Sequence, residues 1–172
     1  RKFIGFLPET PPVYPEMTVT EFLRFAGQLR GMSGPAMRKR MPEVLAACDL
    51  AAVADQVIST LSHGYRQRVG IAQAIVHDPA LLILDEPIQG LDPVQIVEMR
   101  KLIRTLRGKH TILLSTHILS EIEQTCDRIL MLHRGNIAAH GTEEELVTKF
   151  SDRALLELTI RADQAAVRAA LG

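Results

Sequence analysis

The chain has 172 residues, and its 20 Lys and Arg residues balance 20 Asp and Glu residues, so the formal net charge is zero. With 47% hydrophobic and 23% charged residues, the composition is typical of a globular domain with an aliphatic core and excludes a disordered chain. The balanced charge provides no basic surface, so nucleic acid is not an expected partner. No uninterrupted apolar run exceeds five residues, against the roughly 20 that a membrane-spanning helix requires.

The N-terminal third predicts one strand and then a pair of helices. The apolar segment 2–7 is typical of a buried strand, whereas the four prolines between residues 8 and 17 predict an extended loop. Thr18 and Glu21 form a capping box, so the first helix is predicted to begin there and to end before Gly31.

A second helix is predicted from Ser33-Gly34-Pro35 to Cys48, with a bend or break at Pro42. A third is predicted to begin after the turn at Ser62 and to run to about Val76. We therefore expect residues 18–60 to form a small helical subdomain that leads into the third helix.

After residue 76, short aliphatic runs alternate with amphipathic helices, which predicts βαβ units. Asp92 and Pro93 are a typical N-cap and first residue of a helix. Arg134-Gly135-Asn136 predicts a tight turn, and Thr142 with Glu145 predicts another helix cap. The expected strands are 81–84, 111–114, 128–132, 137–140 and 154–160, and the expected helices are 93–106, 119–125 and 163–171.

Two adjacent carboxylates, Asp85 and Glu86, follow the fully apolar strand 81–84. Ligands of open parallel sheets bind at the carboxyl ends of the strands. In a nucleotide hydrolase the first carboxylate holds Mg²⁺ and the second polarises the attacking water. A plain strand-end turn has the same residues, so the interpretation depends on the surrounding segments.

Three further segments favour a phosphate site over a plain turn. Ser62 and Gly64 precede a helix, where a hydroxyl and free backbone N–H groups attract anions. Asp92 lies shortly after the two carboxylates, and His117 ends the next apolar strand, at the same edge of the predicted sheet. Each of these residues also has an ordinary interpretation, as a helix cap or a surface histidine.

In this order and spacing, the segments resemble the motifs of ATP-binding cassette (ABC) ATPases. The matching segments are Leu61–Val69 (signature), Leu81–Pro87 (Walker B), Gly90–Asp92 (D-loop) and His117 (H-loop), and Ile4–Glu9 resembles the Q-loop of exporters of the multidrug or gliding-motility type. The resemblance covers about residues 3–147. It implies an α/β fold, namely a partial P-loop NTPase (RecA-like) core with an inserted helical subdomain, divided into residues 1–17, 18–76, 77–150 and the start of an extension at 151–172.

The resemblance also implies ATP and Mg²⁺ as cofactors. Asp85 would hold the metal, Glu86 would be the general base, and His117 would contact the γ-phosphate. Glu9 stands where most of the family has Gln, and its carboxylate would still serve as a ligand of the nucleotide, the metal or a water molecule.

The signature residues imply a second ATPase subunit in a head-to-tail dimer. Ser62 and Gly64 would touch the γ-phosphate that the opposite subunit holds, and Asp92 would bridge the two subunits. His63 and Tyr65 replace the Gly and Gln that are commoner in the family, whereas Ser62 and Gly64, which supply the phosphate contacts, are retained.

The phosphate-binding loop G-x-x-x-x-G-K-[ST] occurs nowhere in the chain. In the family this loop precedes the Q-loop, so it is expected before Arg1. We therefore expect the chain to be the C-terminal portion of an exporter ATPase subunit that is inactive by itself. The complete protein is expected to lie peripherally on the cytoplasmic face of the membrane, bound to a transmembrane permease subunit whose substrate the sequence does not identify.

Two other functions use the same motifs. Coiled-coil ATPases of DNA repair also carry a signature without a phosphate loop, but they separate the Q-loop from the signature by a long heptad segment. Here only 62 − 9 = 53 positions separate Glu9 from Ser62. The remaining alternative is a non-catalytic interaction module that docks a partner helix through residues 8–29, and nucleotide binding distinguishes it from an ATPase.

Overall fold

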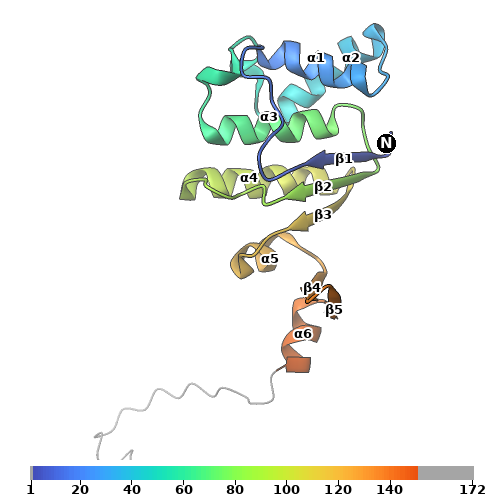
Figure 1. The fold of residues 1–172 in the computed structure, drawn as a ribbon, viewed down its shortest axis with the longest axis vertical. Coiled ribbons are helices and arrows are strands. Elements are labelled where there is room, and N and C mark those ends of the chain that lie inside the picture. The colour runs from blue at the N-terminus through green and yellow to red at the C-terminus, as the bar shows by residue number, and fades with distance from the viewer. Residues whose placement is uncertain (1, 151–172) are drawn as a thin grey trace, which may run out of the picture. The chain divides into compact units, whose positions relative to one another are not determined.

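The structure, a computed structural model, describes residues 2–150. The chain divides into two compact units, residues 1–126 and 127–172, each of which is described by itself (Figure 1). The strand expected at 154–160 and the helix expected at 163–171 lie outside the described residues. Within the described part, no helix has both the length and the apolar character needed to traverse a bilayer.

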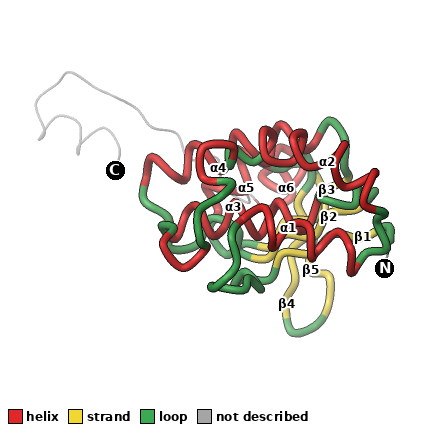
Figure 2. Tube along the Cα trace, turned by 90° about the horizontal axis from the view of Figure 1, so that it is seen from above, coloured by secondary structure: helices red, strands yellow, loops and turns green. Residues whose placement is uncertain are grey.

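The first unit is built on a parallel sheet of three strands, in the order β1 (Ile4–Leu7), β2 (Leu81–Asp85) and β3 (Thr111–Ser115). Figure 2 shows these strands side by side. All three predicted strands are confirmed, and their parallel pairing places Asp85 beside Ser115 at the carboxyl edge of the sheet.

The two predicted N-terminal helices are present as α1 (Val19–Leu29) and α2 (Gly34–Ala47). The capping box is confirmed, because the Glu21 N–H donates to Thr18 Oγ1 while Glu21 Oε2 accepts from the Thr18 N–H. Of the expected bend or break at Pro42, the break is wrong, since α2 continues through it as one helix, and the bend stays a prediction. Proline removes one backbone hydrogen bond, but the buried side chains of Met37 and Val44 hold α2 on both sides of that position.

Two short turns of 3₁₀-helix, Ala51–Val53 and Ile58–Thr60, lead to α3 (His63–Ile75), which packs against β1, β2 and α1 (Figure 1). The approach to β1 is so close that a Cβ added to Gly5 would lie 2.2 Å from the Ala74 carbonyl oxygen. Only glycine fits at that position. The Gln73 side chain, which is almost fully buried, donates from Nε2 to the Phe6 carbonyl at 2.8 Å and joins α3 to the strand.

The opposite face of this sheet carries exposed apolar side chains. Phe6, Ile83 and Leu113 occupy the same register position on the three strands and therefore share a face. Phe6 is 44% exposed and Leu113 is 56% exposed. Ile4, which lies on the same face as Phe6, is 41% exposed, so the uncovered apolar surface extends along β1.

The last helices of the first unit, α4 (Pro93–Arg107) and α5 (Leu119–Thr125), are joined by a paired ionic contact. Arg100 donates to both carboxylate oxygens of the buried Glu121, at 2.9 and 2.6 Å. These hydrogen bonds raise the pKa of the Arg100 guanidinium above its ordinary value. A second ion pair, between Arg68 of α3 and Glu98 of α4 at 2.7 Å, anchors α4 to α3.

The second unit contains a two-stranded hairpin, β4 (Ile129–His133) and β5 (Asn136–Gly141), followed by α6 (Glu143–Phe150). The predicted turn is confirmed, and both of its central residues, Arg134 and Gly135, have positive φ values of 49° and 77°. The expectation that strand 128–132 continues the βαβ series is wrong. Among the described residues β4 pairs with β5 and not with the parallel sheet, and the two-residue turn between the two strands makes that pairing antiparallel.

Candidate functional site

The predicted Asp85 lies where β2 ends, next to the end of β3. The Ser115 hydroxyl donates to Asp85 Oδ1. Both groups offer oxygen atoms at the edge where ligands of parallel sheets bind. Sequence reasoning assigned no role to Ser115, although its place at the end of the next strand was a usable signal.

Glu86 follows in a strained backbone conformation, with a φ of 45°. Left-handed conformations at residues other than glycine cost on the order of 1–3 kcal/mol and persist where neighbouring contacts enforce them. Here the Glu86 N–H donates to the Ser115 carbonyl at 3.0 Å, and the Glu86 carbonyl accepts from the Gln89 N–H at 3.1 Å. These two backbone bonds hold the turn that follows the strand.

The Glu86 side chain contacts the predicted His117, whose Nδ1 lies 2.8 Å from Glu86 Oε1. Because an ionised carboxylate only accepts hydrogen bonds, Nδ1 carries the proton in this pair. The His117 side chain is 68% exposed and that of Glu86 is 18% exposed, so the imidazole remains open to a ligand while the carboxylate is largely enclosed. Within residues 2–150, Nε2 of His117 makes no hydrogen bond, and in the doubly protonated imidazolium form it can donate to a phosphate oxygen.

The residues present at this edge fit a magnesium ion. Mg²⁺ takes oxygen ligands and usually keeps several waters, with one or two protein carboxylates and substrate phosphates completing its shell. Asp85, supported by Ser115, offers a donor set of this kind. Among the described residues, no group of three or more His, Cys, Asp or Glu could hold a metal ion by itself.

The predicted signature residues lie at the start of α3. Ser62 is the N-cap, and its Oγ accepts a hydrogen bond from the Tyr65 N–H at 3.3 Å. Gly64 is buried against α4, because a Cβ added there would lie 2.8 Å from the side chain of Gln95. His63 Nε2 lies 3.1 Å from the Gln89 carbonyl oxygen. The start of α3 therefore packs against segment 89–95.

Asp92 caps α4 as expected from the sequence. Its Oδ1 accepts from the N–H groups of Val94 and Gln95, at 3.0 and 2.9 Å. Its expected role in bridging two subunits stays a prediction.

The Glu9 side chain is exposed, and the hydrogen bond at this residue involves its backbone carbonyl, which accepts from Gln67 Nε2 at 3.4 Å. Within the described part of the chain, no hydrogen bond or ion pair joins Glu9, Ser62 or Asp92 to the two carboxylates at the sheet edge. The site residues thus form two groups, one at the sheet edge and one at the start of α3 with the loop before α4. The metal role of Glu9 stays a prediction.

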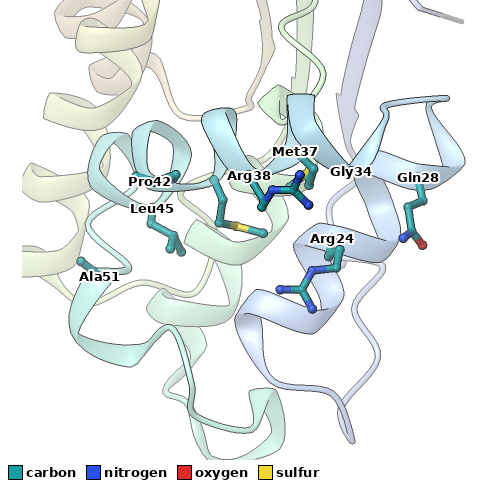
Figure 3. A pocket seen from close by; sticks show the side chains of 9 residues that line it. Arg24, Gln28, Gly34, Met37, Arg38, Pro42, Leu45 and Ala51 are labelled. Carbon is teal, nitrogen blue, oxygen red and sulfur yellow. The ribbon is translucent and has the colours of Figure 1, made fainter.

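A groove of about 600 Å³ lies between α1 and α2, and none of the residues predicted to bind or hydrolyse ATP lines it (Figure 3). Met37, Met41 and Leu45 of α2 give it an apolar lining, at spacings of four residues that keep them on one side of the helix. Arg24 extends from α1 and Arg38 from α2. No acidic residue lines the groove.

Comparisons with known proteins agree with these observations. The family model described as "ABC transporter" matches residues 1–89. The chain is 40% identical over 146 residues to the uncharacterized ABC transporter ATP-binding protein YxlF of Bacillus subtilis (strain 168), an alignment that covers 85% of this chain and 50% of that protein. It is 36% identical over 149 residues to the Nod factor export ATP-binding protein I of Ralstonia nicotianae (strain ATCC BAA-1114 / GMI1000), covering 86% and 46% respectively.

A solved "Structure of ATP binding subunit of ABC transporter" is similar in fold, with a TM-score of 0.74 and 33% identity over 99% of this chain and 69% of that chain. The chain spans about half the length of the two relatives named above. The strand end with its two carboxylates, the serine-capped α3 and the family match together show that this chain belongs to the ABC transporter ATP-binding family and has its α/β P-loop NTPase fold.

Proposed function

We propose that this chain is the C-terminal portion of an ATPase subunit that powers an ABC exporter. The observation that carries the proposal is the pair of Glu86 and His117, 2.8 Å apart beside Asp85 at the carboxyl edge of the sheet. The relative whose name denotes Nod factor export supports the exporter type. The substrate of ATP hydrolysis is a phosphoanhydride, and this pair supplies a base and, when both imidazole nitrogens carry a proton, a hydrogen-bond donor for it.

In the proposed mechanism, Glu86 orients the attacking water and accepts its proton. His117, held at Nδ1 by the Glu86 carboxylate, donates from Nε2 to the γ-phosphate as the doubly protonated imidazolium. Asp85, oriented by Ser115, is the residue that would hold Mg²⁺. When bound, Mg²⁺ neutralises charge on the phosphate oxygens. The enclosed position of the Glu86 carboxylate favours proton transfer from a fixed water over exchange with bulk solvent.

The second group of residues serves the opposite subunit in a head-to-tail dimer. The start of α3 presents backbone N–H groups together with the Ser62 hydroxyl, an arrangement that stabilises anions. In the proposed dimer, Ser62 and Gly64 contact the γ-phosphate held by the partner, and Asp92 lies at the subunit boundary. Glu9 contributes a carboxylate ligand to the water or metal near the nucleotide.

The α1/α2 groove is the proposed docking site of the transmembrane permease subunit, which places the ATPase peripherally on the cytoplasmic face of the membrane. An apolar floor with two arginines suits an amphipathic helix that carries acidic side chains. Arg38 makes no ion pair within the described residues, so its charge is available to such a partner. Arg24 lies near the opposite charge of the exposed Glu21.

The chain carries no G-x-x-x-x-G-K-[ST] motif. In the proposal, a phosphate-binding loop belongs to the complete subunit and precedes these residues. The complete subunit, a term used below for the protein that contains that loop, is therefore the form in which catalysis is tested.

The test compares two variants of the complete subunit. Glu86→Gln keeps the size and hydrogen bonding of the side chain but removes the base, so the hydrolysis rate falls by about 10²–10⁴-fold while ATP binding survives. The ATP-bound dimer then accumulates, as size-exclusion chromatography with ATP would reveal. Asp85→Asn weakens the metal site, so nucleotide binding and hydrolysis are lost together.

Glu144→Gln is a matched control, because it makes the same carboxylate-to-amide change at an exposed position of α6. It should hydrolyse ATP at the parental rate in a steady-state assay. If Glu86→Gln also keeps the parental rate, Glu86 is a strand-end turn residue and the catalytic assignment is wrong.

A further inference from the structure

His63 connects the two groups of site residues within one subunit. It is the first residue of α3, and its Nε2 lies 3.1 Å from the Gln89 carbonyl oxygen. A carbonyl only accepts hydrogen bonds, so Nε2 carries the proton and donates it. The Gln89 N–H in turn donates to the Glu86 carbonyl at 3.1 Å. A continuous path of hydrogen bonds therefore runs from the start of α3 to the Glu86 turn.

Two close approaches show that this junction is packed as well as hydrogen-bonded. Gly90, with a φ of 72°, lies so near that a Cβ added there would be 3.3 Å from His63 Nε2. One residue further along α3, a Cβ on Gly64 would lie 2.8 Å from the side chain of Gln95. The imidazole thus fills the space between the α3 N-terminus and the loop that links β2 to α4.

We propose that His63 is a positioning residue that fixes segment 86–92 relative to the start of α3. The inference rests on the proposed function, in which these two segments serve different nucleotides of the dimer. A glycine at position 63 would have no side chain for this contact. With His63, the segments are already aligned before the dimer closes, so less ordering is needed when ATP binds.

The proposal predicts a separation of KM from kcat in the complete subunit. His63→Ala should raise the KM for Mg-ATP by about two- to tenfold, the range expected for loss of one hydrogen bond. The kcat should stay within about twofold, because no group that touches the nucleotide is removed. His63→Gln should restore the parental KM, since its side-chain amide also donates to a carbonyl. His140→Ala, at an exposed position of β5, is the matched control.

A second measurement does not depend on hydrolysis. In the 172-residue chain without nucleotide, hydrogen exchange of the Gln89 and Leu91 amides reports on the segment, because both donate within this turn. Exchange should be faster in His63→Ala and parental in His63→Gln. Unchanged exchange in His63→Ala, or equal effects of both substitutions, would overturn the inference.

The two measurements separate this inference from the proposed function. If the parental complete subunit does not hydrolyse ATP, the proposed function fails, while the exchange result still decides whether His63 fixes segment 86–92. If exchange rises in His63→Ala but KM and kcat stay parental, the proposed function stands and the role of His63 in nucleotide binding is wrong.

Discussion

His77 is the residue whose environment makes the stability of this chain depend on pH. It follows α3, and its Nε2–H donates to the Ile4 carbonyl of β1 at 3.2 Å. Its Nδ1 is buried without a hydrogen-bond partner. Burial, with a contribution from the nearby Arg30 charge, lowers the pKa of His77 below its ordinary value of 6.5. The folded chain therefore favours the neutral imidazole.

Because the pKa is lower in the folded chain, the unfolded chain binds the proton more readily once the pH falls below 6.5. The contribution of neutral His77 is fully present above 6.5 and is lost progressively between that value and the lower folded pKa. His77→Gln keeps a donor for Ile4 but does not titrate. Between about pH 7.5 and about pH 5.5, the variant should lose less unfolding free energy than the parent.

Urea unfolding followed by circular dichroism at these two pH values measures the difference. Equal losses of unfolding free energy in the parent and in His77→Gln would show that the protonation of His77 does not change on unfolding. A matched His140→Gln variant, at an exposed position, should behave like the parent.

Sequence reasoning found the local helix caps and placed His117 at the same sheet edge as Glu86, but it missed other contacts between residues that lie far apart in the chain. The caps formed by Thr18 and Asp92 involve neighbours within three positions, and both were predicted. Ser115 with Asp85 and His63 with Gln89 are 30 and 26 positions apart. Those contacts depend on strand register and helix packing, which residue patterns along the chain do not encode directly.

At the scale of the elements, the α1/α2 groove provides a test of the proposed permease contact. If acidic side chains of the permease pair with the groove, Arg24→Glu together with Arg38→Glu places like charges opposite them. Association of the complete subunit with its membrane subunit should weaken by about tenfold or more. Co-purification in detergent measures it, while ATP hydrolysis by the detached subunit should be unchanged.

Lys101→Glu is the control for this prediction, because it reverses an exposed charge on α4, outside the groove. Exchanging acidic residues of the permease segment for lysine should rescue the double variant. Undiminished association of the double variant would place the permease contact elsewhere.

The spacing of apolar residues predicted helices and strands correctly where those apolar residues are buried, as in α1, β2 and α4. The spacing was misleading where a single residue or a short loop decides the geometry. Pro42 predicted a bend or a break, yet buried residues on both sides keep α2 unbroken. The aliphatic run of β4 resembles the preceding parallel strands, and only the two-residue turn after it reveals the antiparallel partner.

For the whole molecule, we predict that the 172-residue chain binds Mg-ATP weakly or not at all. The edge of the sheet carries the proposed base and the proposed metal ligand, but the chain contains no glycine-rich loop with its lysine to cradle the β- and γ-phosphates. Isothermal titration calorimetry should detect no binding at micromolar concentrations. Micromolar affinity that depends on Asp85 would show that the described residues suffice for nucleotide binding.

The uncovered sheet face has a practical consequence for work with this chain in solution. Each of the three strands contributes an apolar side chain to this face, namely Phe6, Ile83 and Leu113. Phe6 and Leu113 are each more than 40% exposed. Such surfaces associate through the hydrophobic effect, and sulfate strengthens that association whereas urea weakens it. The chain is therefore expected to salt out early and to remain dispersed best in dilute, low-sulfate buffer with mild detergent.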